Sequence, residues 1–274
     1  MKKIKKLFNI FWVQLYLELK LQMRYVNSAI SSLVLYAGAF LIVILFTKPA
    51  ELGQAYGTKQ GVLFTIVGFL FWSIGIASLG GCSNGVETDE RTGLLESETQ
   101  SVFPLWALYF IQTLAENLFV WIYLLIIGIV ASFFSMFTVA ELLKAILLTF
   151  AFSLISNLGM FGIGMIFASG SIRFKRMGQW ATILQALLLM LSNVYFPVYN
   201  AFQEVIPYVG GIEIVRQIFL GHGVSLSKLM LFIVVNVIRF LLGILIFNYC
   251  IKKRAKTVHL THFKLEKGDI YFNV

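Results

Sequence analysis

The sequence predicts an all-α integral membrane protein. Of its 274 residues, 59% are hydrophobic and only 13% are charged, with a mean hydropathy of +0.84. Soluble domains carry about 25% charged residues. Long uncharged stretches and only four prolines favour helices over a β-barrel, whose strands alternate in units of about ten residues.

The apolar stretches divide into six predicted transmembrane helices. A helix needs about 20 predominantly apolar residues to cross a bilayer. Four stretches of that length are uncharged, and two more contain one charge each, Glu116 and Arg239. The predicted spans are 27–47, 61–83, 104–133, 143–170, 178–196 and 228–251. With no soluble domain recognisable, residues 1–274 are predicted to be a single transmembrane domain that ends in the tail 252–274.

Both ends of the chain are predicted to lie in the cytoplasm, with the protein as a multi-pass component of the cell membrane. In this arrangement sixteen lysines and arginines lie on the side of the termini and five on the other side, with Arg239 inside the membrane. Cytoplasmic segments carry such an excess of basic residues. The same excess accounts for the net charge of +9 without a nucleic-acid partner.

Residues 1–26 precede the first span and are predicted to form an amphipathic helix at the membrane surface. Its two sides, at about 100° per residue, carry Ile4, Phe8, Phe11, Trp12, Leu15, Leu19 and Met23 on one and Lys2, Lys6, Asn9, Lys20 and Arg24 on the other. A basic, aromatic helix of this kind lies in the headgroup plane and contacts membrane lipids, including anionic ones. It either anchors the chain only or also acts as a mechanical element.

The external segment before the sixth span, residues 192–223, is too apolar for an ordinary loop. Pro197, Pro207 and the pair Gly210–Gly211 divide it into pieces too short to span. We predict short re-entrant helices, because irregular backbone at membrane depth must be buried in protein or line a cavity. Glu213 and Arg216 lie three residues apart on one helical face and are expected to pair. An interfacial loop bearing aromatic residues is the alternative.

Two charged residues fall inside predicted spans. Counted at 1.5 Å per residue from the cytoplasmic ends of their helices, Glu116 and Arg239 both lie about 18 Å deep. Each alone would cost roughly 2.5–3.5 kcal/mol to insert. We expect the two to pair and hold the third span against the sixth, or else to contact substrate in a translocation pathway.

Catalytic signatures are missing from the sequence. It has no P-loop, no H-E-x-x-H and no G-x-S-x-G pattern. Cys82 and Cys250, with three histidines, show no zinc-ligand spacing. The chain is therefore predicted not to be an enzyme and to bind no metal and no cofactor. Two alternatives to a transport role stay open: a non-transporting scaffold or sensor, and a lipid-phosphate enzyme that would use the acids Glu87, Asp89 and Glu90.

The densest charge cluster lies in one short loop, GVETDERTGLLESETQ (85–100), after the second span. Within it, ETDERTGLLES followed by Pro104 resembles the loop pattern of the membrane subunits of ABC-2-type ABC transporters. The external segment FPVYNAFQEVIPYVGGIEIVRQIFLG (196–221) is similar to that family's segment of prolines ahead of an arginine-bearing helix. The chain departs from the pattern in having Leu94 where the family has threonine, and in the extra residues before Pro104.

The resemblance implies that this loop forms a short cytoplasmic coupling helix that inserts into a separate ATPase subunit. On that basis the acids would form salt bridges with the ATPase, Arg91 a counter-pair, Leu94 and Leu95 an apolar anchor, and Gly93 a point of close backbone approach. The coupling residues it implies are Glu87, Asp89, Glu90, Arg91, Gly93, Leu94, Leu95 and Glu96. The alternative is a solvated turn whose charges only keep the loop out of the bilayer.

The same resemblance implies a permease that works with two ABC ATPase subunits, which would hold ATP and magnesium, and with a second permease copy, as a homodimer or heterodimer. Export is the direction that it favours. Aromatic residues in the second and fifth spans (Phe64, Phe69, Phe71, Trp72 and Tyr195) suit an amphipathic or apolar cargo such as a peptide, drug, lipid or lipid-linked glycan.

Overall fold

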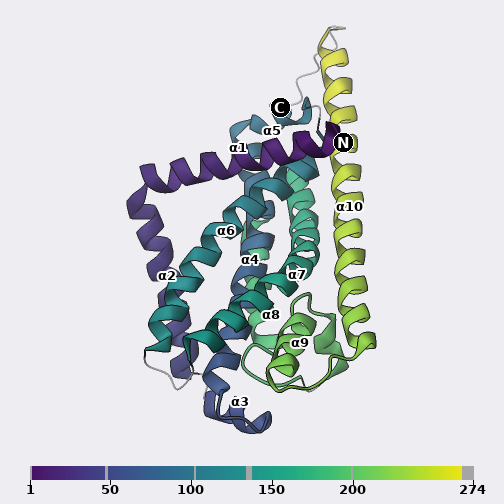
Figure 1. The fold of residues 1–274 in the computed structure, drawn as a ribbon. Helices are drawn as coiled ribbons and strands as arrows, with labels where there is room; N and C mark the ends of the chain where they lie inside the picture. Colours follow the sequence, from purple (N-terminus) through teal and green to yellow (C-terminus); the bar gives the residue numbers. More distant parts are fainter. Residues whose placement is uncertain (1, 47–48, 102, 134–137, 199, 267–274) are drawn as a thin grey trace.

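The computed structural model describes residues 2–46, 49–101, 103–133, 138–198 and 200–266, and every regular element within these ranges is helical (Figure 1). Five helices of the described part are long and apolar enough to cross a membrane. They are α2 (Val26–Phe46), α4 (Gly61–Thr92), α6 (Leu105–Ser132), α7 (Val139–Phe174) and α10 (Leu226–Glu266). The all-α membrane fold class is therefore confirmed.

The fifth predicted span is shorter than expected. Helix α8 (Gly178–Leu191) has 14 residues, which extend about 21 Å at 1.5 Å per residue, against a hydrocarbon core about 30 Å thick. The chain then turns, and the Tyr208 hydroxyl donates a hydrogen bond to the Leu188 carbonyl over 2.9 Å. The exact count of six spans is accordingly not confirmed, although the structure places an apolar helix at each predicted position.

Several boundaries differ from the prediction. Helix α4 continues nine residues past the predicted end at residue 83, and α7 begins at Val139 and ends at Phe174. Helix α10 continues to Glu266, so most of the predicted tail is helical, whereas residues 267–274 lie outside the described part. These extensions carry polar residues, which a hydropathy criterion excludes although the helix itself continues.

Helix α4 lies at the centre of the bundle and contacts α6, α7 and α8. Of its apolar stretch, 78% is buried inside the protein. Helix α7 packs on α4 at one side and on α10 at the other. Both contacts are close because glycines face backbone: a Cβ on Gly164 would lie 2.7 Å from the Leu79 carbonyl oxygen, and Gly162 of α7 meets Gly243 of α10. Small residues allow membrane helices to approach in this way.

The bundle has two distinct ends (Figure 1). Helix α1 (Lys2–Arg24), the short helix α5 (Leu94–Thr99) and the last turns of α10 lie at one of them, called here the α5 end. Helices α3 (Pro49–Ala55) and α9 (Val209–Phe219) lie at the other, the α9 end, where α9 also contacts the 3₁₀ turn η1 (Ala201–Val205).

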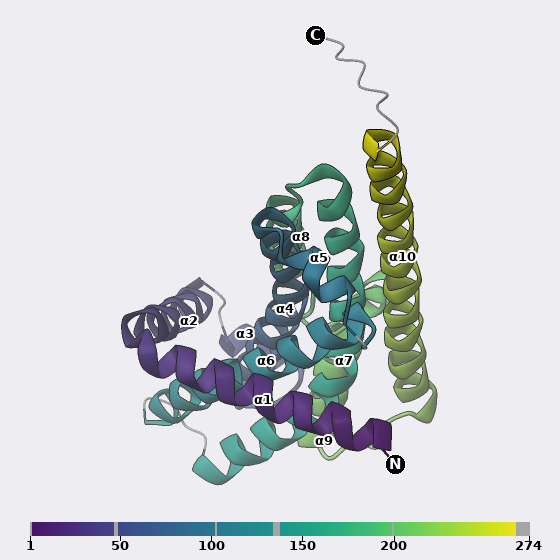
Figure 2. The ribbon, with the colours of Figure 1, turned by 90° about the horizontal axis from the view of Figure 1, so that it is seen from above.

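Helix α1 lies across the α5 end and packs on α6, as Figure 2 shows from above. The side that meets the bundle is partly polar: Gln22 accepts a hydrogen bond from Tyr123 of α6 over 3.0 Å. Large apolar side chains such as Phe8, Trp12 and Met23 stay exposed. The predicted N-terminal helix is confirmed, and its exposed apolar side chains fit a position in the membrane surface.

Candidate functional site

The α4–α5 corner contains the residues predicted to form a coupling helix. Gly93 ends α4 with a backbone φ of 78° and directly precedes α5. This left-handed conformation favours glycine. No atom lies within 4 Å of the place where a Cβ would stand. The turn conformation, rather than the close backbone approach expected from the sequence, is thus the reason for a glycine here.

The two leucines of the corner point in different directions. Leu95 is 1% exposed and lies in an apolar cluster with Cys82, Leu105, Phe161 and Phe247, which come from α4, α6, α7 and α10. Leu94 is 54% exposed. The structure therefore divides the predicted pair: Leu95 fixes α5 to the bundle, and Leu94 is free to meet a partner.

Glu87 caps the neighbouring helix α8. One of its carboxylate oxygens accepts hydrogen bonds from the backbone N–H groups of Gly178 (2.7 Å) and Met177 (3.0 Å), and from the Ser171 hydroxyl at 3.4 Å. These donors are at the start of a helix, where unpaired N–H groups and the helix dipole attract an anion. Glu87 thus holds the turn between α7 and α8 against α4.

Asp89 faces inward as well, toward α6. It accepts a hydrogen bond of 2.6 Å from the Tyr109 hydroxyl. Burial raises the pKa of the nearby Glu98 carboxyl; the Tyr109 hydroxyl opposes that shift, and the charge of Asp89 adds to it. The two acids and the tyrosine join α4, α5 and α6.

The third acid, Glu90, is ion-paired with Arg254 of α10, and the Glu90 side chain is only 6% exposed. Arg254 also approaches Glu96 of α5, with 3.6 Å between nitrogen and oxygen. In the sequence, Arg254 is one of the sixteen lysines and arginines predicted to lie on the side of the termini. No local pattern could have found this contact, because the partners are far apart in the chain.

The corner therefore has an inner and an outer side. Glu87, Asp89, Glu90 and Leu95 connect it to four other helices of the bundle. Arg91, Gly93, Leu94 and Glu96 are exposed. Only this second group presents a surface on which another protein could dock.

The predicted pair of Glu116 with Arg239 is not formed. Glu116 accepts a hydrogen bond from Gln112, one turn earlier in α6, over 3.1 Å. Arg239 donates to the Val205 carbonyl of the 3₁₀ turn η1. The sequence prediction matched the depth of the two residues but not the direction in which they face: α6 meets α10 through Phe110, whose ring centroid is 5.5 Å from that of Phe240.

Glu116 instead faces α4 and lines a cavity of about 600 Å³. The carboxylate lies so close to Gly81 that a Cβ there would be 2.8 Å from its Oε2 atom. The cavity extends along one side of α4 between α2, α6 and α8. Its lining consists of Tyr36, Ile76, Ala77, Gly80, Gly81, Asn84, Gly85, Thr88, Asp89, Gln112, Glu116, Val120 and Gln185.

Arg216 organises the external segment. Its guanidinium is fully buried and donates hydrogen bonds to the carbonyl oxygens of Asn193 (2.8 Å), Phe196 (3.4 Å), Val194 (2.9 Å) and Phe64 (3.0 Å). It thereby ties the segment after α8 to α4. Residues 192–194 and 206–208 are buried in protein, as expected for a re-entrant segment, whereas Phe196, Phe202 and Val205 between them are exposed, as the alternative of an interfacial loop would have them.

The expected ion pair between Glu213 and Arg216 is also not formed. Glu213 accepts hydrogen bonds from the Tyr56 hydroxyl at 2.6 Å and from Gln217 at 2.8 Å. Burial raises the pKa of Tyr56, so its hydroxyl stays protonated as a donor. Spacing alone could not reveal that backbone carbonyls occupy Arg216 so fully.

Both predicted prolines lie at bends of this segment rather than inside a helix. Pro197 precedes η1, and Pro207 lies just before α9. The Pro207 carbonyl accepts a hydrogen bond from Asn236 of α10 over 2.9 Å. The bends bring α9 under α4 and α7, with which it is in contact.

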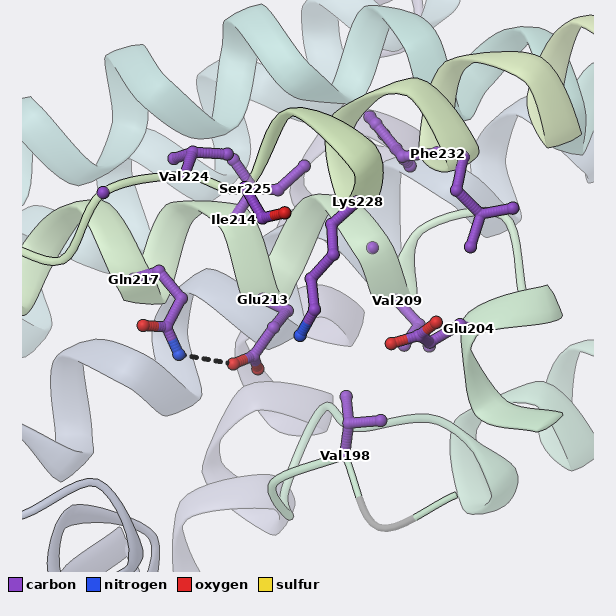
Figure 3. Close-up of a pocket in the computed structure, with 13 residues that line it drawn as sticks. Val198, Glu204, Val209, Glu213, Ile214, Gln217, Val224, Ser225, Lys228 and Phe232 are labelled. Atoms are coloured by element: carbon purple, nitrogen blue, oxygen red, sulfur yellow. Dashed lines mark hydrogen bonds between the residues drawn. The ribbon is translucent and has the colours of Figure 1, made fainter. Parts of the chain in front are cut away.

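A second, smaller cavity of about 200 Å³ opens at the α9 end (Figure 3). Glu204, Glu213 and Lys228 contribute its charged side chains, and Val209 and Phe232 belong to its apolar wall. Figure 3 shows the Lys228 amine lying between the two carboxylates, so this cavity contains one positive and two negative side chains.

Three of the aromatic residues expected along a pathway belong instead to the core. Phe64, Phe69 and Phe71 are at most 1% exposed. In α4 they pack among other buried residues, and Phe69 contacts the ring of Phe40, with 5.3 Å between centroids. The polar cavity around Glu116, and not an aromatic surface, is the open space along α4.

Comparison with known proteins gives one match. A family model described as ABC-2 type transporter matches residues 11–220, well over half of the chain. The matched range includes α4, the α4–α5 corner and the external segment up to the end of α9. No curated protein and no solved structure shows a significant match.

Proposed function

The chain belongs to the family of ABC-2 type transporters and is a permease subunit of an ABC transporter; on that premise we propose that it exports an amphipathic or apolar substrate while a separate subunit hydrolyses ATP. Members of this family work with ABC ATPase partners, and the chain is a multi-pass membrane protein. We propose two ATPase copies, with ATP and magnesium held by them, and a second permease copy of the same or a similar chain.

One observation carries the proposal: α5 is exposed on one side and firmly held on the other. Leu94, 54% exposed, is adjacent to Leu95, which is 1% exposed. A coupling element needs both properties. The exposed side must bind the ATPase. The buried side must be packed firmly enough to transmit the movement of the ATPase to the other helices.

The inner contacts give that movement a route. A displacement of the α4–α5 corner acts on α6 through Asp89, on α8 through Glu87, and on α10 through the contacts of Glu90 and Glu96 with Arg254. A carboxylate takes part in all of these contacts, and such charge-assisted interactions are shorter and stronger than neutral hydrogen bonds. In this proposal ATP-driven closure of the partners shifts these helices together and alters access to the cavity along α4.

The proposal also implies an orientation of the protein in the membrane. The α5 end faces the cytoplasm, because that is where an ATPase finds ATP, and the excess of lysines and arginines agrees with that assignment. Helix α1 then lies in the inner surface of the membrane. The α9 end, with its buried Arg216, closes the outer side.

Co-purification tests the proposal. The tagged chain, extracted from its native membrane in mild detergent, should bring down an ABC ATPase, and Leu94→Asp should abolish this capture. Leu226 is the matched control, since it is 68% exposed but lies at the α9 end; Leu226→Asp should leave capture intact. A non-transporting scaffold or sensor would bring down no ATPase from membranes that contain one.

A further inference from the structure

The charged side chains that line the cavity along α4 are all acidic. Its lining includes two carboxylates, Asp89 and Glu116, and, among the described residues, no lysine, arginine or histidine. Asp89 is occupied by the Tyr109 hydroxyl. Glu116 has only an uncharged partner, Gln112. In a chain with a net charge of +9, a cavity without a basic side chain is a local exception.

Glu116 is placed where an unpaired carboxylate is costly. It belongs to α6, one of the helices long and apolar enough to span the membrane, and its helix neighbour supplies an amide rather than a cation. Charged side chains inside a membrane face a polar cavity or pair with an opposite charge. Here Glu116 faces the cavity, and a positively charged ligand bound there would supply the opposite charge.

The walls of the cavity are amphipathic along its length. Ile76, Ala77 and Val120 form the deeper part, while Asn84, Thr88 and Gln185 form the part nearer the α5 end. Tyr36 adds an aromatic ring, whose face attracts organic cations. Gly80 and Gly81 have no side chains, so α4 does not fill the space beside Glu116.

We infer that this cavity binds the cationic group of an amphipathic substrate, with Glu116 as its counter-charge and Tyr36 as an aromatic contact. The inference rests on the proposed function for its role in transport and narrows the cargo from amphipathic compounds in general to organic cations. Neither anionic lipids without a cationic group nor uncharged glycans would supply this counter-charge.

A pair of probes with matched shape tests the charge preference. Tetraphenylphosphonium and tetraphenylborate have the same size and shape and opposite charge. The purified chain in nanodiscs of zwitterionic phosphatidylcholine should bind the phosphonium and not the borate, after subtraction of empty nanodiscs. Glu116→Gln should weaken phosphonium binding about tenfold or more, because a partly desolvated charge pair is lost.

Three further variants keep the test decisive. Gln185→Lys places a positive charge on the opposite wall without touching Glu116, and it should weaken binding even if Glu116→Gln fails to fold; Gln185→Met controls for the change of shape. Glu204→Gln alters the outer cavity and should have no effect. Equal binding of both probes, unchanged binding in Glu116→Gln, or a loss in Glu204→Gln would each overturn the inference.

This assay needs no ATPase, so it separates the inference from the proposed function. Phosphonium binding through Glu116 in a chain that captures no ATPase would leave the cation site standing and remove the transport role. Capture of an ATPase through Leu94 by a chain that does not bind the phosphonium would support the transport role and remove the cation site.

Discussion

Glu90 at the end of α4 is ion-paired with Arg254 of α10, in a contact that joins the α4–α5 corner to the last membrane helix. The Glu90 side chain is 6% exposed and that of Arg254 is 27% exposed, so the pair is partly removed from water. Arg254 also reaches Glu96 on α5. One arginine thus connects three helices at the end of the bundle where we expect the ATPase to bind.

Breaking this contact should destabilise the protein. Arg254→Ala leaves Glu90 nearly buried without its counter-charge, and we expect a loss of about 2 kcal/mol in the free energy of unfolding. Thermal unfolding in detergent checks it. Arg91→Ala, an exposed arginine at the same corner, should change stability by less than about 0.5 kcal/mol. Equal losses in the two variants would contradict the assignment.

Arg216 should be irreplaceable by lysine. Its guanidinium donates to four carbonyl oxygens from both the external segment and α4, a geometry that a single ammonium cannot reproduce. Arg216→Lys should therefore lower the free energy of unfolding by about 3 kcal/mol. Lys228→Arg, a conservative change at the same end of the bundle, serves as the control in the same thermal unfolding experiment and should be neutral.

Gly93 should tolerate only residues that adopt a left-handed backbone. Its φ of 78° is strained for alanine, although the space around it is open. Gly93→Ala should cost about 1 kcal/mol, and Gly93→Asn should cost less. Thermal unfolding of the two variants measures the order. If alanine is tolerated better than asparagine, the backbone conformation is not the reason for the glycine.

Glu98 should make stability depend on pH. Burial raises the pKa of its carboxyl in the folded state above the value of about 4.5 in the unfolded chain. The folded state therefore holds the proton more tightly, so the contribution of Glu98 to stability is present below pH 4.5 and is lost as the pH rises through the folded pKa. Glu98→Gln should remove this loss, and its melting temperature should rise relative to wild type between acidic and neutral pH. A gap that narrows over that range would contradict the direction of the shift.

The long apolar helices could be predicted from the sequence because hydropathy and length determine them directly. The fold class and the N-terminal helix follow from the same patterns. The short helix after the second span begins only at Leu94, because residues 85–92 of the predicted loop continue α4. The end of α8 at Leu191 was not predictable, since the residues that follow are as apolar as a span. There the turn depends on long-range contacts, such as the hydrogen bond from Tyr208 to Leu188.

The hydrogen-bond and ion-pair partners of the charged residues could not be predicted from the sequence. Depth along a helix placed Glu116 and Arg239 together, but which way each faces depends on how α6 and α10 pack. Spacing along one helix paired Glu213 with Arg216, yet Arg216 binds carbonyl groups supplied by residues 193–196 and Phe64. Such contacts join segments distant in the chain, and no local periodicity records them.

In the proposed function, the ATP-driven movement of the partner ATPase reaches this permease through the exposed side of α5. Photo-crosslinking from position 94 tests it most directly, with a photoreactive amino acid replacing Leu94 in the full chain within its native membrane and the same replacement at Leu226 as the control. The account predicts a crosslink to an ABC ATPase from position 94 and none from position 226. Efficient photo-activation at position 94 without an ATPase adduct, in membranes where that ATPase is present, would contradict it.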